Sequence, residues 1–269
     1  GFYVLDDYSA LRQIDEGTFE ADFKMFTSRP GLAYIPDSKY GYSGSGFQGA
    51  NFFKSPNPEM GVTLYYYLKE KPHTKSSTRR KAEKEAIKEG KNVSYPTKEE
   101  IYAEKLEEKP YLLFVISDIT GNEVHRGTSK VQKGIGKYNW NGKVSGPNEL
   151  DLKKAPFTVP REAQLALPGK YTVSVYLSED GLPRLLTENH EIELERLNMN
   201  TIVENPEEAF AFQNSLNSAR REAYGVDQFF KDIQKRVKRA KANSRSITNT
   251  NTDLLTDLRA IEKTLNRIE

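Results

Sequence analysis

Hydrophobic and polar residues alternate along several segments between residues 61 and 194, and toward the C-terminus the hydrophobic residues recur every three or four positions. Alternation places every second side chain on one face of a β-strand, whereas a spacing of three and four marks one face of an α-helix. The sequence therefore predicts a β-rich region followed by a helical tail.

Residues 61–69 form a predicted strand with two distinct faces. Tyr65 and Tyr67 lie on one face, and the opposite face carries Val62, Leu64, Tyr66 and Leu68. The next predicted strand, residues 111–117, is apolar on both faces. Because a strand exposed on one side alternates, we expect a cover over this one in addition to its partner sheet.

An insertion at residues 70–109, dense in Lys, Arg and Glu, separates these two strands. Its first half, 76–89, is typical of a charged helix. In its second half Thr97 and Glu100 have the spacing of a capping box, which predicts a helix through about Glu107. Neither segment carries a broad apolar stripe, so we expect a mobile, solvated excursion.

After a turn at residues 118–122 the chain continues as short strands separated by Gly, Pro and Asn. Trp140 shares a strand face with Tyr138, which makes it a predicted core anchor. The most regular strand, residues 170–177, points Tyr171, Val173, Val175 and Leu177 inward, and residues 185–194 supply a last strand. This pattern is typical of an antiparallel β-sandwich of the Ig-like or fibronectin-III-like kind.

Residues 1–56 are less regular. Residues 2–5 and 19–26 predict two short strands, and residues 28–58 predict a long loop of Gly, Ser, Pro, Asn and aromatic residues. A loop of this length is functional or is held against something larger.

The helical tail begins at Asn205, a favourable N-cap followed by Pro206. Hydrophobic residues then recur in alternating steps of four and three along a helix of roughly 35 residues and form an apolar seam on one of its faces. The residues of this seam are Phe212, Leu216, Ala219, Ala223, Val226, Phe230, Ile233, Val237 and Ala240. A second helix carries the same spacing through Leu254, Leu258, Ile261, Leu265 and Ile268.

The two helices predict an antiparallel helical hairpin over residues 201–269. The second helix has about half the length of the first, so it can cover the seam only from Val226 to Ala240. The remaining half, Phe212 to Ala223, needs another partner. That partner is either the sandwich or a second copy, so the chain is a monomer or a coiled-coil dimer.

Amino-acid composition excludes several kinds of catalytic and metal site. The chain has 269 residues, a net charge of +2, a mean hydropathy of −0.72, three histidines and no cysteine. The lack of cysteine excludes disulfides, thiolate nucleophiles and Cys-based metal sites. The histidines are too far apart in sequence to suggest a metal pair, so neither a metal nor a cofactor is expected. No apolar run approaches the ~20 residues of a membrane span, and no signal peptide is recognisable.

Several stretches resemble, in matching order, the post-propeller region of sortilin-like, BNR-repeat β-propeller proteins, bacterial proteins often labelled glycosyl hydrolases. They are residues 1–7 (GFYVLDD) with Leu11-Arg12-Gln13, then Asn57-Pro58, Gly61 and Tyr66-Tyr67-Leu68, then Ile116-Ser117-Asp118, Gly121, Gly136, Trp140 and residues 168–171 (PGKY). The last series is also similar to the Ig-like domain of flagellar hook-capping proteins. The chain departs from the family at Asn141, where an Asp is usual, and in a longer stretch at 143–167.

The resemblance implies three parts: a propeller-closing strand and linker at 1–56, an Ig-like sandwich at 57–200, and the helical hairpin at 201–269. It implies an exported protein whose upstream propeller is a partner of this region. The hydrolase label does not carry over, because no residue here matches a catalytic motif.

Candidate binding residues are few. Tyr40, Tyr42, Tyr65 and Tyr67 are candidates for a ligand site, because aromatic rings stack on sugars. The alternative places Tyr40 and Tyr42 in a linker laid along a propeller, and Tyr65 and Tyr67 beneath the helical hairpin.

Asp6, Asp7, Asp118 and Glu123 are the candidate acids of a glycosidase, which needs two carboxylates across a cleft. Their positions at turns favour a structural role. The basic run from Lys231 to Arg245 favours a solvated helix face, so no nucleic-acid partner is expected.

The sequence thus predicts a non-catalytic structural or interaction module that buttresses a propeller or binds a protein or glycan partner. The alternative is a carbohydrate-binding module that serves a glycoside hydrolase.

Overall fold

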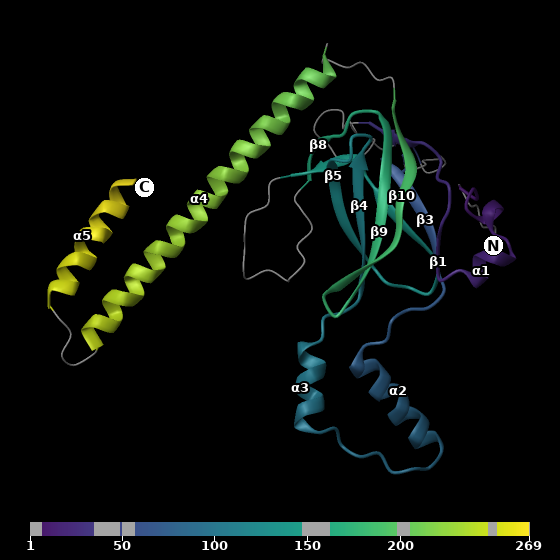
Figure 1. Ribbon diagram of the computed structural model, residues 1–269, viewed down its shortest axis with the longest axis horizontal. Coiled ribbons are helices and arrows are strands. Elements are labelled where there is room, and N and C mark those ends of the chain that lie inside the picture. The colour runs from purple at the N-terminus through teal and green to yellow at the C-terminus, as the bar shows by residue number, and fades with distance from the viewer. Residues whose placement is uncertain are drawn as a thin grey trace. The chain divides into compact units, whose positions relative to one another are not determined.

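The computed structural model describes residues 7–34, 49, 57–146, 162–197, 205–246 and 252–268 (Figure 1). About 41% of these residues are helical and about 33% lie in strands, so helix exceeds strand in what the sequence predicts to be a mainly β chain. The chain divides into two compact units. The first holds the strands and extends to Phe210, and the second holds the rest of the long C-terminal helix and the helix after it.

The larger sheet has five strands in the order β2-β10-β9-β4-β5. Their bounds are Gly31–Ala33 for β2, Leu182–Arg196 for β10, Gly169–Glu179 for β9, Tyr111–Asp118 for β4 and Glu123–Lys130 for β5. Neighbouring strands are antiparallel except β2 and β10, which run parallel. A short parallel strand thus extends an otherwise antiparallel sheet at its β10 edge.

A second sheet has the order β1-β3-β6, all antiparallel, with β1 at Phe23–Met25, β3 at Val62–Leu68 and β6 at Gly134–Trp140. Two short strands, β7 at Lys143–Ser145 and β8 at Glu162–Leu165, pair with each other. The sequence pattern did not indicate β2, β7 or β8. Strands of three or four residues show too few alternations to be recognised.

The side chains of the two larger sheets fill one hydrophobic core. Trp140 of β6 is fully buried and packs edge-on against Tyr171 of β9 with ring centroids 5.1 Å apart. The four β9 residues expected to point inward are buried, namely Tyr171, Val173, Val175 and Leu177, and so is the β3 face that carries Val62, Leu64, Tyr66 and Leu68. The alternation therefore identified the core correctly.

The N-terminal segment, residues 7–34, differs in part from the prediction. The strand expected at 19–26 is present only as β1, Phe23–Met25, and the first two residues of that range belong to the short helix α1, Glu16–Glu20. A capping box between Asp15 and Thr18 explains the change, because each side chain satisfies the other's backbone N–H and starts a helical turn. A 3-10 turn, η1 at Leu11–Gln13, precedes α1. The predicted strand at residues 2–5 lies outside the described residues.

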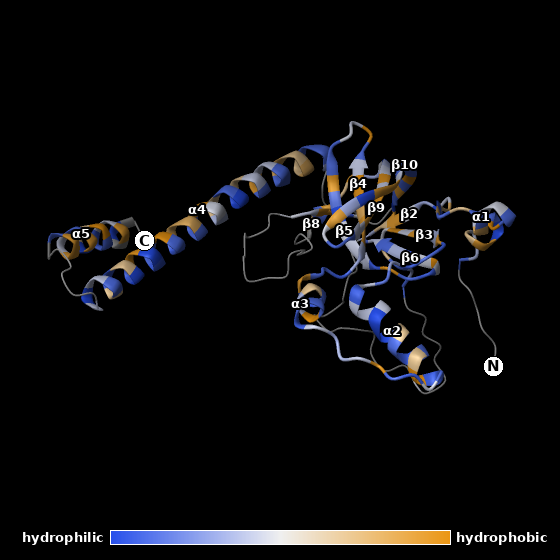
Figure 2. Ribbon diagram, turned by 60° about the horizontal axis from the view of Figure 1, so that its bottom comes forward, coloured by the Kyte–Doolittle hydropathy of each residue, from blue (hydrophilic) through white to orange (hydrophobic). Residues whose placement is uncertain are grey.

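The insertion contains two helices, α2 at Lys75–Lys88 and α3 at Lys98–Leu106, as predicted. The capping box between Thr97 and Glu100 is present. Arg79 of α2 forms ion pairs with Glu104 of α3 and with Glu83 of its own helix. Figure 2 shows α2 as largely hydrophilic, whereas hydrophobic residues gather in the strands and in α5. Neither α2 nor α3 contains a buried residue.

The tail consists of α4, Pro206–Ser246, and α5, Thr252–Ile268. Asn205 caps α4 by accepting a hydrogen bond from the backbone N–H of Glu208. Hydrophobic residues of the two helices form one cluster, built from Val237, Leu258 and Leu265 with Phe230, Ile233 and Ala240 around them. Lys241 also pairs with Glu262 at 2.7 Å. α5 therefore contacts the C-terminal half of the α4 seam from Phe230 onward, whereas Val226, which we expected α5 to cover, is 68% exposed.

Candidate functional site

The sequence singled out four tyrosines, and the structure describes two of them. Tyr40 and Tyr42 lie outside the described residues. Tyr67 has only 9% of its surface exposed and packs in a cluster with Ala10 and Phe26. Tyr65 is partly buried against the same cluster. The N-terminal segment covers this face of β3, so the ring of Tyr67 is not open to a ligand.

Side-chain hydrogen bonds attach the N-terminal segment to the rest of its unit. The amide of Gln13 bonds both backbone groups of Thr27, accepting from its N–H at 2.8 Å and donating to its carbonyl at 2.9 Å. Asp15 accepts from Thr18 and pairs with Lys24, and these hydrogen bonds lower the pKa of Asp15 to about 2. The segment is thus tied down at several points rather than lying as a free linker.

The same segment exposes apolar side chains as well. Tyr8, Leu11 and Phe19 lie within one stretch of twelve residues, and their side chains are 51%, 49% and 56% exposed. Phe19 also meets Tyr67 edge-on, with ring centroids 5.6 Å apart. The segment therefore covers β3 with Ala10 and Phe26, leaves Tyr8 and Leu11 exposed, and places Phe19 at the boundary, where its ring contacts Tyr67 but stays more than half exposed.

The candidate carboxylates each serve local structure. Asp118 accepts hydrogen bonds from the backbone N–H groups of Thr120 and Asn122, which closes the turn after β4. Glu123 pairs with Arg126 three residues later. Asp7 accepts from the N–H of Ser9 and lies 3.4 Å from the Arg29 guanidinium. Asp6 lies outside the described residues.

Shifts in pKa follow from these contacts. Burial raises the pKa of Asp118, but hydrogen bonds from Thr120 and Asn122 outweigh it, so the net shift is downward. At Asp7, hydrogen bonds from Ser9 and the charge of Arg29 likewise outweigh burial and lower the pKa. Both groups are therefore held as carboxylates, which fits hydrogen-bond acceptors in turns better than proton donors in a reaction.

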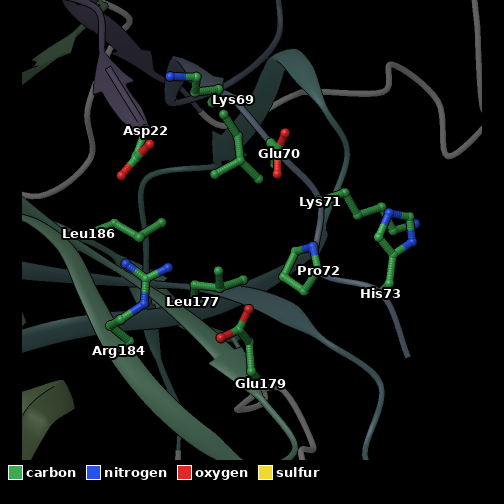
Figure 3. A pocket seen from close by; sticks show the side chains of 11 residues that line it. Asp22, Lys69, Glu70, Lys71, Pro72, His73, Leu177, Glu179, Arg184 and Leu186 are labelled. Carbon is green, nitrogen blue, oxygen red and sulfur yellow. The ribbon is translucent and has the colours of Figure 1, made fainter. Parts of the chain in front are cut away.

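A cavity of about 540 Å³ opens at one end of the two larger sheets (Figure 3). Its floor is apolar and consists of Leu68 from β3 with Leu177 and Leu186 from β9 and β10. Its rim carries Pro72, His73 and charged residues of both signs. The acidic residues are Asp22, Glu70 and Glu179, and the basic residues are Lys69, Lys71 and Arg184. In Figure 3, Asp22, Leu186 and Arg184 lie on one side, and Lys71, Pro72 and His73 lie on the other.

Local structure explains how the cavity forms. Lys69 follows β3 and donates its backbone N–H to the Asp22 carbonyl at 2.9 Å, which joins the ends of β3 and β1. Arg184 stands opposite Leu177 in the β9–β10 pair. Such a cavity can take an apolar side chain on its floor while the rim pairs with charged groups of either sign. That chemistry suits a protein partner.

The described ranges contain no group of three or more His, Cys, Asp or Glu side chains that could hold a metal ion. Within them, none of the helices is long and apolar enough to cross a membrane.

Comparison of the chain with protein-family profiles, with curated proteins and with solved structures gives no match. The resemblance to the post-propeller region of sortilin-like proteins therefore stays a prediction from sequence motifs.

Sequence reasoning did not find the cavity. Its residues come from three places far apart in the chain: Asp22, the stretch 68–73, and the β9–β10 pair. Only the stretch after β3, Lys-Glu-Lys-Pro-His, gave a local signal, and it was interpreted as the start of the charged insertion. The sequence pattern also does not predict the exposed apolar set Tyr8, Leu11 and Phe19, of which only Phe19 lies in α1.

Proposed function

We propose that this chain is a non-catalytic structural and interaction module, an Ig-like β-sandwich with an antiparallel helical hairpin, from the C-terminal part of a larger exported β-propeller protein. In this proposal the module buttresses the propeller. The sequence motifs of the first and second parts of the chain support the family, and the structure offers a surface on which to test it.

Two features support the Ig-like assignment. The Tyr171 hydroxyl, at the start of β9, donates a hydrogen bond to the backbone carbonyl of Leu167. A tyrosine that bonds back to the backbone a few residues upstream is the tyrosine corner of Ig-like domains. The two larger sheets also share one core, which β3 and β9 fill with the side chains of one strand face, as a sandwich requires.

One observation carries the proposed role, namely the exposed set formed by Tyr8, Leu11 and Phe19. These residues lie on the segment that would follow a propeller directly. The segment already covers Tyr67 with Ala10 and Phe26, so its outer apolar side chains need a second contact to be buried. A neighbouring propeller domain would provide it.

The test measures binding between this chain and the polypeptide encoded directly upstream of it, produced separately, by isothermal titration calorimetry. We expect a complex, and we expect Leu11→Lys and Phe19→Lys each to weaken it by about ten-fold or more, because a buried large apolar side chain contributes about 1.5–3 kcal/mol. Leu182→Lys is the matched control, since Leu182 is 76% exposed at the start of β10.

Absence of binding by the wild-type chain, or equal weakening by Leu182→Lys, would contradict the proposal. The carbohydrate-binding alternative predicts a different result. It requires binding to a glycan array that Tyr65→Ala removes, with no effect of Leu11→Lys.

A further inference from the structure

The seam of α4 continues beyond the part that α5 contacts. Its first half consists of Phe212, Leu216, Ala219, Ala223 and Val226, called here the open seam. Phe212 and Val226 are 66% and 68% exposed, and both alanines are exposed. The second half, from Phe230 onward, packs with Leu258 and Leu265 of α5. Among the residues that the structure describes, one continuous apolar stripe is therefore covered along half of its length only.

The spacing of the open seam specifies what can cover it. Steps of four and three average 3.5 residues, the repeat of a coiled-coil seam, which keeps a stripe facing a second helix along its length. Of the other helices in the described chain, α2 and α3 bury no residue and carry no apolar stripe, and α5 already contacts α4. The helix that offers a matching seam is α4 itself, in another copy.

We propose that the open seam pairs antiparallel with the open seam of a second copy of this chain, around a two-fold axis near residues 217 and 218. In this register Phe212 faces the partner's Ala223, and Leu216 faces the partner's Ala219. The next layer places Val226 against the partner's Ala209. Each bulky residue therefore meets an alanine, and alternation of large and small residues across facing positions is what allows two helices to interdigitate.

Charges beside the seam select this register. It sets Arg220 beside the partner's Gln213 and Glu222 beside the partner's Ser215, so no like charges meet. A parallel pairing would set Glu222 beside the partner's Asp227. An antiparallel pairing moved by one heptad would set Arg220 beside the partner's Arg220 and Glu222 beside the partner's Glu222. Like charges at these flanking positions oppose pairing.

The pairing also fits the length that is available. From Ala209 to Val226 the paired segment measures about 26 Å at 1.5 Å per residue. It ends just before Phe230, where the contacts with α5 begin. The partner helix would therefore continue an interface that α5 already forms on the same stripe.

The first experiment measures the mass of the full chain by sedimentation equilibrium over a range of concentrations. We expect a dimer of twice 30.6 kDa. Ala219→Glu and Ala223→Glu should each give a monomer, since glutamate keeps the helix but fills the place that Leu216 or Phe212 of the partner needs. Ala242→Glu, the same change at an exposed position of α4 away from the seam, should leave the dimer intact.

A monomeric wild-type chain overturns the proposal, and so does a dimer that Ala219→Glu and Ala223→Glu leave unchanged. Far-UV circular dichroism of each variant must show wild-type helix content, so that loss of the dimer is not loss of the helix.

The second experiment determines orientation by distances between spin labels. The chain has no cysteine, so Ala242→Cys gives one label per copy. The antiparallel register predicts a separation of about 70 Å between the two labels, because both lie far from the axis. A label at Ser218→Cys, next to the axis, should give a short distance. Short distances at both positions would indicate a parallel dimer and overturn the proposed register.

Discussion

Tyr171 and Leu167 are joined by a hydrogen bond from the tyrosine hydroxyl to the backbone carbonyl four residues earlier, at 2.5 Å. Tyr171 is 6% exposed, and its ring packs against Trp140 in the core. The bond therefore fixes the chain where it enters β9. Burial raises the pKa of the Tyr171 hydroxyl to about 12, with a further contribution from the charge of Asp118, so the group remains a donor at every pH where the protein is studied.

Replacing Tyr171 by Phe should destabilise the strand-bearing unit by about 1–2 kcal/mol, because the Leu167 carbonyl loses its buried partner. Urea unfolding followed by the fluorescence of Trp140, the single tryptophan, measures the loss. Tyr176→Phe is the control, since Tyr176 lies on the other face of β9 and is partly exposed. An equal effect of both substitutions would show that the corner bond does not stabilise the fold.

Gly136 and Gly225 should respond in opposite ways to the same change. A Cβ at Gly136 would overlap the ring of Tyr66, which is fully buried and cannot move aside. We expect Gly136→Ala to cost about 1–3 kcal/mol through overpacking. Gly225 lies within α4 with nothing near its would-be Cβ, so Gly225→Ala should stabilise that helix by about 1 kcal/mol.

Thermal unfolding followed by far-UV circular dichroism tests both substitutions. A neutral Gly136→Ala would mean that Tyr66 can be displaced at little cost.

Stability should decrease below about pH 6.5 because of His190. Burial lowers the pKa of His190 from 6.5 and outweighs its hydrogen bond with the Phe26 backbone and the charge of Glu191, which raise it. The folded protein therefore binds a proton less readily than the unfolded chain. Its contribution is complete above the unfolded pKa and is lost as the pH falls from there through the folded pKa.

Urea unfolding between pH 8 and pH 5 tests this expectation. The wild-type chain should lose more stability over this range than His190→Gln, whereas His73→Gln, which removes an exposed imidazole, should behave as the wild type. Equal losses in the wild type and His190→Gln would assign the pH dependence to other groups.

Arg79 should hold the two helices of the insertion together. Its guanidinium contacts Glu104 on α3 and Glu83 on α2, and the hydrogen bonds that it donates to Glu104 lower the pKa of that carboxyl group. Arg79→Gln should increase hydrogen exchange in α3 and speed proteolysis between residues 89 and 97. Arg80→Gln is the matched control, because Arg80 is exposed on the same helix. Unchanged exchange in Arg79→Gln would show that α3 is stabilised by other contacts.

Much of the fold could be predicted from local pattern. The inward residues of β3 and β9, the burial of Trp140, the capping boxes and N-caps at Thr97 and Asn205, and the coverage of half the α4 seam all follow from periodicity and helix chemistry. These features depend on residues a few positions apart, which is the range that sequence pattern reports.

Other features could not be predicted in this way. Alternation from Phe19 to Phe26 indicated a strand, and β1 forms at Phe23–Met25, but the Asp15–Thr18 capping box starts α1, which includes the first two residues of that range. Tyr67 was expected beneath the helical hairpin, yet Ala10 and Phe26 cover it. The cavity joins residues from three separate stretches, so no window of sequence contains it.

The sequence by itself determined which faces of the strands are apolar, where the helices begin, and that thiol chemistry is absent. Only the tertiary structure decided which segment covers Tyr65 and Tyr67, that β2 adds in parallel to β10, and that the apolar floor of the cavity has a rim of mixed charge. The physical reason is that hydrophobic periodicity shows which face of a helix or strand is apolar and is therefore buried in the folded protein. The identity of the segment that buries it depends on how distant parts of the chain fit together.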